Sequence, residues 1–159
     1  MAGHPCNGLI CFEYRHWNRL NYHDDCLVLV YNPATRNTVL VPRGKGKGKG
    51  KGKEIYNYRL EGLGFCSSSN EFRVVCLYHT LGSFRCELFT LGQRGAQGTH
   101  HLQLLSRSWK RVGDLPCGIC DITKCMCHVK GRVYWIMKLP SDSSFKHVLS
   151  LDLKLEEFK

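Results

Sequence analysis

Long hydrophobic runs are missing from this sequence. No apolar stretch among the 159 residues approaches the roughly 20 residues that a membrane-spanning helix needs. The first residues, Met1–Cys6, have neither the charged segment nor the apolar segment of a secretory signal peptide. These absences argue against a membrane partner and against export, so we expect a cytoplasmic or nuclear protein.

A helical pattern of apolar residues is missing as well. No stretch before Lys154 keeps apolar residues at a 3.6-residue spacing over the roughly 10 residues that predict a helix. Short segments rich in β-branched and aromatic residues instead alternate with Gly, Pro, Asn and Ser. The expected strands are 8–12, 27–32, 37–41, 55–65, 72–79, 86–91, 109–112, 131–137 and 149–155. The pattern predicts an all-β fold of antiparallel strands in one domain, 1–159.

Cysteine is abundant, with ten residues, but the context for disulfides is absent. Disulfides form mainly in exported proteins, so we expect reduced thiols. Free cysteines inside strand-like runs behave as small buried hydrophobic residues. The cysteines in such runs are Cys11, Cys26, Cys66, Cys76 and Cys86.

Basic charge is concentrated in one glycine-rich tract. The chain has 23 basic and 13 acidic residues, a net charge of +10, and five of the lysines alternate with glycine between Lys45 and Lys53. Glycine has much conformational entropy to lose and the like charges repel, so we expect a flexible loop at 44–53. The alternative is weak binding of nucleic acid through release of counterions. No aromatic residue lies in the tract to stack on bases.

A strand followed by a polar turn occurs three times. The copies are Val28–Arg36, Glu87–Leu91 leading to Ser106–Lys110, and Val148–Leu153 leading to Glu156–Lys159. When Tyr31, Phe89 and Leu151 are taken as equivalent points, the intervals are 58 and 62 residues. A propeller blade of four strands takes roughly 40 to 50 residues. Propellers have about four to eight blades, so three units predict a propeller-like fold that is incomplete at one or both ends.

Six motifs in a fixed order resemble the F-box-associated domain of plant F-box proteins, a kelch-like substrate-binding region. The motifs are Cys6–Cys11, Tyr31–Arg36 with Leu40–Pro42, Gly62–Phe65 with Glu71–Val75, Ser108–Arg111, Val129–Trp135, and Leu149–Leu153 before Glu157–Phe158. The resemblance covers nearly the whole chain.

This resemblance implies a non-catalytic substrate-recognition module of an SCF-type (Skp–cullin–F-box) E3 ubiquitin ligase, with a protein substrate as partner. Ubiquitin transfer would be carried out by other subunits. In the family a helical F-box normally precedes the Cys-Asn-Gly motif, and here only five residues precede Cys6. A Skp-type adaptor is therefore an expected partner only of a longer form that carries an F-box.

A metal site has one weak set of candidate ligands. Cys117 and Cys120 have the two-residue gap that lets both thiolates bind one zinc ion, and Cys125, Cys127 and His128 follow. The second group is not a standard zinc knuckle. In the resembled family 125–129 is a strand, which would place Cys125 and Cys127 on one face and His128 with Met126 on the other. We therefore expect no metal and no cofactor, with zinc binding or redox pairing as the alternatives.

Catalytic signatures are also missing. The eight histidines are scattered without a local Ser or Cys triad signature, and the Gly-Lys tract lacks the hydroxyl residue of a phosphate-binding loop. The pair Asp24-Asp25 is typical of a solvated turn. No enzyme is expected.

Loops are the expected binding elements, because connections carry most recognition residues. The candidates are 15–25, the Gly-Lys tract, and 92–101. In the first of these Trp17, with Tyr14, Arg15 and His16 beside it, is the candidate anchor for a protein partner. Trp109, Tyr134 and Trp135 are instead expected in the cores of the blades.

Two rival readings remain open at this point. One is a basic β protein that binds nucleic acid through the Gly-Lys loop. The other is a nonfunctional truncated remnant whose exposed strand edges aggregate.

Overall fold

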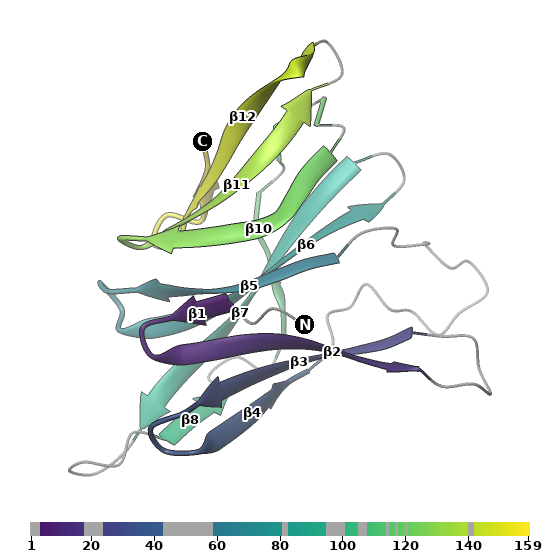
Figure 1. Ribbon diagram of the computed structural model, residues 1–159. Coiled ribbons are helices and arrows are strands. Elements are labelled where there is room, and N and C mark those ends of the chain that lie inside the picture. The colour runs from purple at the N-terminus through teal and green to yellow at the C-terminus, as the bar shows by residue number, and fades with distance from the viewer. Residues whose placement is uncertain are drawn as a thin grey trace.

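The computed structural model describes residues 4–17, 24–42, 59–80, 83–94, 101–104, 108–113, 115–116, 118–119, 121–139 and 142–159. Within these ranges every regular element is a strand, and the strands form three antiparallel sheets (Figure 1). No helix of the described residues is long and apolar enough to cross a membrane. The predicted all-β, antiparallel class is confirmed.

Each sheet is a meander in which consecutive strands pair. Sheet A contains β1 (His4–Cys6), β2 (Leu9–Trp17), β3 (Asp24–Asn32) and β4 (Asn37–Val41). Sheet B contains β5 (Arg59–Cys66), β6 (Glu71–Thr80), β7 (Ser83–Arg94) and β8 (His101–Leu104), and β9 (Lys110–Arg111) also pairs with β7. Sheet C contains β10 (Asp121–Val129), β11 (Arg132–Leu139), β12 (Asp142–Asp152) and β13 (Glu157–Phe158). Three sheets built in this way make an incomplete propeller.

Turn chemistry explains where the strands reverse. Asn7-Gly8 and Lys130-Gly131 both have two positive φ angles, 44° and 79° in the first and 47° and 77° in the second. This is the two-residue turn whose twist matches antiparallel strands, and its second position favours glycine. The first of these turns joins β1 to β2, so the Asn-Gly signal marks a hairpin, and β1 is a strand that the sequence prediction missed.

A second kind of turn is repeated in sheets A and C. The Asn32 Oδ1 accepts hydrogen bonds from the backbone N–H groups of Ala34 and Thr35, at 3.0 and 3.3 Å. The Asp152 Oδ1 accepts the equivalent pair from residues 154 and 155, at 3.0 and 3.1 Å. Side chains of this kind mimic a backbone turn. The strand expected at 149–155 therefore ends at Asp152, where the turn competes with the alternating apolar pattern.

The pairing register aligns the three sheets. The second residue of the second strand pairs with Tyr31 in sheet A, with Leu91 in sheet B and with Leu151 in sheet C. These positions, 31, 91 and 151, are 60 residues apart in both intervals. The predicted equivalence of the three third strands is confirmed, but the equivalent residue in sheet B is Leu91, two residues beyond Phe89.

One face of every sheet carries the same four apolar positions, and we call it the leading face. These positions are the second and fourth residues of the second strand and their partners on the third strand. They are Ile10, Phe12, Leu29 and Tyr31 in sheet A, Phe72, Val74, Phe89 and Leu91 in sheet B, and Val133, Trp135, Leu149 and Leu151 in sheet C. The opposite face is called the trailing face.

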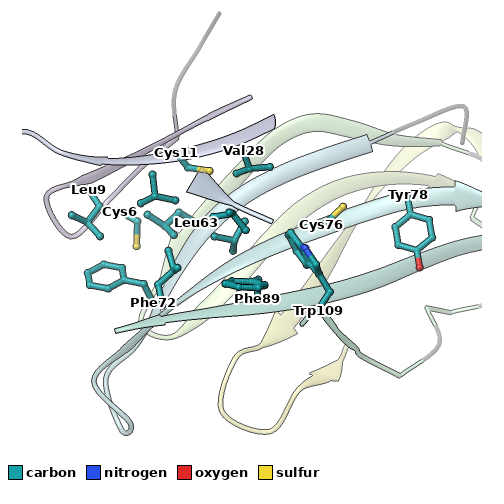
Figure 2. Packing of buried hydrophobic residues seen from close by; sticks show 14 residues of the cluster. Cys6, Leu9, Cys11, Val28, Leu63, Phe72, Cys76, Tyr78, Phe89 and Trp109 are labelled. Atoms are coloured by element: carbon teal, nitrogen blue, oxygen red, sulfur yellow. The ribbon is translucent and has the colours of Figure 1, made fainter. Parts of the chain in front are cut away.

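The leading face of each later sheet packs on the trailing face of the sheet before it. In the first core, the leading residues of sheet B meet Leu9, Cys11, Val28 and Val30 of sheet A (Figure 2). In the second core, the leading residues of sheet C meet Val75 and Leu88 of sheet B. Sheet B thus lies between two cores, and neighbouring residues of β6 such as Val74 and Val75 are both fully buried.

The first strands of the three sheets meet along the middle of the fold. In Figure 1, β5 lies between β10 and β1. The approach is close at Gly64, where an added Cβ would lie 2.5 Å from the Leu153 Cδ1 and 3.0 Å from the Val133 Cγ2. At Gly62 the side chain of Met126 occupies the same kind of space. Glycine at these positions lets sheet C pack directly against the backbone of β5.

Candidate protein-binding surfaces

The aromatic and basic segment that was expected in a loop belongs to strand β2. Tyr14, Arg15, His16 and Trp17 pair in turn with Leu27, Cys26, Asp25 and Asp24 of β3. The prediction of a loop over 15–25 is therefore wrong for residues 15–17 and for Asp24-Asp25, and 18–23 lie outside the described residues. Residues with aromatic rings favour paired strands, and the ladder extends the hairpin despite the polar sequence. We call residues 14–17 and 24–27 the hairpin arm.

The connections of the meander divide between two ends of the sheets. The turns Asn7-Gly8, 33–36, 67–70, Lys130-Gly131 and 153–156 lie at one end, the turn end. The hairpin arm extends toward the other end, the arm end, where β4 also finishes and β5 begins. The Gly-Lys tract of 44–53 falls between β4 and β5 and lies outside the described residues.

The third expected loop, 92–101, is wrong for residues 92–94 and for His101, which belong to strands. Residues 92–94 belong to β7 and His101 to β8, with Gly92 paired to Gln103 and Arg94 to His101. The hairpin ladder continues through Gly92 because its partner strand supplies the backbone groups that it needs. The end of β7 and the start of β8 lie at the turn end. Residues 95–100, between these two strands, lie outside the described residues.

At the turn end, His128 joins the first strands of all three sheets. Its Nδ1 lies 3.4 Å from the Cys6 Sγ on β1, and its Nε2 lies 3.1 Å from the backbone nitrogen and 3.0 Å from the backbone oxygen of Phe65 on β5. Burial raises the pKa of the Cys6 thiol to about 11, so the sulfur is a neutral thiol at neutral pH. Either neutral tautomer of the imidazole can then use both ring nitrogens.

Of the candidate metal ligands, the structure describes the side chains of Cys127 and His128, and these two point apart. His128 directs its ring at β5, whereas Cys127 is exposed, as expected for neighbouring positions on a strand. Cys117 and Cys120 lie outside the described residues, and nothing is described of the Cys125 side chain. Among the side chains that are described, no three His, Cys, Asp or Glu groups come close enough to hold a metal ion.

Most of the described cysteines are part of the two cores. Cys6, Cys11, Cys66, Cys76 and Cys86 are free and buried, which confirms the prediction for the four that it named among them. Cys66 lies at the start of the 67–70 turn. Burial opposes ionisation there, but hydrogen bonds from Ser68 and Ser69 and the positive charge of Arg73 outweigh it and lower the pKa of Cys66.

A charged cluster ties sheet B to the last turn of sheet C. Glu156 forms ion pairs with Arg73 on β6 and with Lys110 on β9, and Arg73 also pairs with Glu71 at 3.3 Å. Burial opposes the negative charge of Glu156, but hydrogen bonds from Lys110 and Arg73 prevail and lower its pKa. Glu156 has a positive φ of 58°, so the turn itself aims the side chain at sheet B. The strand-and-turn repeat included Glu156, but nothing in the sequence indicated its contact with sheet B.

The large aromatic residues divide between the cores and the surface. Trp109 and Trp135 are buried as predicted, and the Trp109 Nε1 donates to the Pro42 carbonyl at the end of β4, 2.6 Å away. The Trp109 ring also packs on Phe89, with ring centroids 5.5 Å apart (Figure 2). Tyr134 is different, because it lies on the trailing face of sheet C and is only half-buried. The prediction of a core position for Tyr134 is therefore wrong.

Comparison with known families accounts for the three-sheet architecture. The model of the F-box associated beta propeller domain matches residues 1–159. This chain belongs to the F-box associated beta propeller domain family. No curated protein and no solved structure matched it. The family match extends over all three sheets, including the turns at Asn7-Gly8, Asn32 and Asp152.

Within this F-box associated propeller domain, the residues in question have two kinds of role. His128, Cys6, Arg73 and Glu156 hold the sheets together. The sequence did not predict these contacts, because each crosses from one sheet to another. The hairpin arm is a separate feature, formed by the paired ends of β2 and β3. Its residues are the candidates for contact with another protein.

Proposed function

We propose that this domain holds a protein target for an SCF-type ubiquitin ligase in the cytoplasm or nucleus and carries out no chemistry itself. The observation that carries the proposal is the family match over residues 1–159. In a longer form, an F-box would bind the Skp-type adaptor and this domain would present the target. Ubiquitin transfer would then take place on other subunits.

The arm end is the part of the domain that we assign to target binding. Five of the connections at the turn end hold only two or four residues, and side-chain hydrogen bonds and positive φ angles constrain several of them. The connections at the arm end include the longer spans 18–23 and 43–58. Variable connections on a rigid frame are the usual place for recognition. Tyr14, Arg15, His16 and Trp17 on the hairpin arm lead into the first of these spans.

Capture of partners from plant extract tests the proposal directly. The purified chain and the same chain fused to an intact F-box serve as baits, and mass spectrometry identifies the captured proteins. We expect Skp-type adaptor and cullin with the fusion alone, and one shared protein with both baits. Absence of any shared protein would contradict target holding, even if the fusion captures the ligase subunits.

Substitution on the hairpin arm then tests the assigned surface. Trp17→Ala is expected to weaken binding of the captured protein by about 30-fold or more, the loss typical of an aromatic anchor at an interface. Leu155→Ala at the turn end is the matched control, because Leu155 is 55% exposed and large. Its affinity should stay unchanged. If Leu155→Ala weakened binding and Trp17→Ala did not, the target would bind at the turn end instead of the arm end.

Nucleic acid is the second candidate partner, because five of the lysines behind the +10 net charge lie in the Gly-Lys tract. If the tract binds nucleic acid, affinity falls steeply with salt and is lost when Lys45, Lys47, Lys49, Lys51 and Lys53 are changed to Ala.

Thermal unfolding of the purified chain tests whether it is a nonfunctional remnant. Aggregation or non-cooperative melting would indicate a nonfunctional remnant instead.

A further inference from the structure

The leading face of sheet A has the composition of an interface but no sheet in front of it among the described residues. Its four positions are Ile10, Phe12, Leu29 and Tyr31, and all four are apolar or aromatic. The equivalent positions in sheets B and C are at most 3% exposed, whereas these four are half-buried. Leu40 lies beside Leu29 on the same face and is 50% exposed. The face is thus equipped to receive a preceding blade.

The trailing face of sheet C is the complementary case. The fifth residue of its second strand and the paired residue of its third strand are Ile136 and Val148, which are 40% and 63% exposed. In sheet B the same two positions are Val75 and Leu88, which are 0% and 2% exposed against sheet C. Ile136 and Val148 are therefore as apolar as the equivalent pair in sheet B, which is buried. This face is equipped to receive a following blade.

We propose that a second copy of this chain covers both faces. The trailing face of sheet C in one copy packs on the leading face of sheet A in the other, as sheet A packs on B and B on C within the chain. Two such contacts related by a two-fold axis join three blades to three blades and close a six-bladed ring. Six lies within the range of about four to eight blades that closed propellers have.

A second copy explains the pattern better than an unrelated partner does. The two open faces occupy opposite sides of the blade repeat, so the contact is head-to-tail. Head-to-tail contacts close a ring when the rotation per subunit is right, and otherwise they grow into filaments. The internal packing already sets the rotation between neighbouring blades, and the proposed contact repeats it. Because the same repeat positions are used, no new kind of interface is needed.

The turn residues of the proposed contact also match. Between sheets B and C, Arg73, the third residue of β6, binds Glu156 in the turn before β13. The equivalent residues at the open faces are Tyr134, the third residue of β11, and Arg36 in the turn before β4. Arg36 is exposed and has the same positive φ as Glu156, 53° against 58°. An arginine against a tyrosine ring is an attractive pair.

The molar mass of the purified 159-residue chain is the first test. Light scattering on a size-exclusion column should give 36.4 kDa, which is twice 18.2 kDa. Leu40→Lys on the leading face and Val148→Glu on the trailing face should each give 18.2 kDa, because each places a charge in both contacts of the ring. Leu155→Glu is the control, since Leu155 is equally exposed but lies in a turn, and it should remain dimeric.

Mixing the two monomeric variants gives the decisive result. In a mixed dimer one contact joins two unchanged faces, and the other brings the introduced lysine against the introduced glutamate. We therefore expect the mixture to return to 36.4 kDa. A dimer that joined two leading faces or two trailing faces would not be restored by mixing. A chain that is monomeric at every concentration, growth into filaments, or a mixture that stays monomeric would overturn the proposal. Circular dichroism of each variant checks that it is folded.

Discussion

The middle sheet and the outer sheets bury the same kind of residue to different extents. In β6 the neighbours Val74 and Val75 are both 0% exposed, because sheet A covers one and sheet C the other. In β11 the equivalent neighbours Trp135 and Ile136 are 3% and 40% exposed, because sheet B covers only the first. Burial of a side chain in this fold therefore depends on whether a neighbouring sheet covers it. The apolar pattern of a strand shows which side chains could be buried, but not which ones are.

The same comparison separates two kinds of stabilisation. The seams on either side of sheet B are built mainly from apolar side chains, with His128 and Glu156 as polar connections at the turn end. The outer faces of sheets A and C have similar apolar residues, but no described sheet covers them. Substitutions at matched positions should reveal the difference.

The largest effect is expected for a leucine in the covered leading face. Leu149→Ala should lower the free energy of unfolding by about 3 kcal/mol, because it leaves a cavity between sheets B and C. Leu29→Ala removes the same atoms from the half-buried leading face of sheet A and should cost about 1 kcal/mol. Urea unfolding measures both losses of stability, at protein concentrations low enough for the chain to be monomeric. Equal losses would mean that the two leading faces are equally covered.

A smaller effect is expected when one seam is overfilled. Gly64→Ala forces a methyl group against Leu153 and Val133, and should cost about 2 kcal/mol through displaced side chains. Gly113→Ala is the control, because nothing lies within 4 Å of the added atom. The control should change stability by less than about 1 kcal/mol. Thermal unfolding measures both changes. If Gly64→Ala left the stability unchanged, the close approach of sheet C to β5 would be contradicted.

The smallest effect is expected for the charged cluster, and it depends on pH. Glu156→Gln should cost about 1 kcal/mol at neutral pH, because the ion pairs with Arg73 and Lys110 lose their charge. The pKa of Glu156 is below its usual 4.5 in the folded state, so its contribution is present above pH 4.5 and is lost as the pH falls through the folded value. The gap between wild type and variant should therefore close in acid.

Glu157→Gln tests whether that behaviour is specific to Glu156. Glu157 is the next residue along the chain and is exposed on β13, so its substitution should leave thermal unfolding unchanged at both pH values. A gap of the same size at neutral and acidic pH for Glu156→Gln would assign the loss to side-chain shape instead of charge.

Local chemistry made much of the fold predictable. The Asn7-Gly8 and Lys130-Gly131 pairs, the Asx residues before the four-residue turns, and the strand composition all act within a few residues, so the sequence displays them directly. The third strands of the three repeats were found for the same reason. In sheet B the equivalent position was predicted at Phe89, two residues before Leu91. The error arose because the connections inside the repeats differ in length, whereas the pairing of second and third strands is the same in each sheet.

Contacts between sheets were not predictable in the same way. Nothing near His128 in the sequence indicates that its ring will meet Cys6 and Phe65, because those partners are brought there by two other sheets. Arg15–Trp17 were assigned to a loop because polar residues surround them, whereas strand pairing with β3 decides their structure. Tyr134 was placed in a core for its size, and the absence of a covering sheet among the described residues decides its exposure.

The meander of each sheet also sets an order of events during synthesis. Strands pair with their neighbours in sequence, so sheet A can form as soon as β4 has been made, and such local pairing is fast. Its Val28 and Val30 then remain uncovered until β6 and β7 have been translated, because sheet B supplies their partners. A substitution that delays the β6–β7 hairpin would leave that surface open on the nascent chain. Its damage would be seen as loss of yield and capture by chaperones, even when the finished domain is stable.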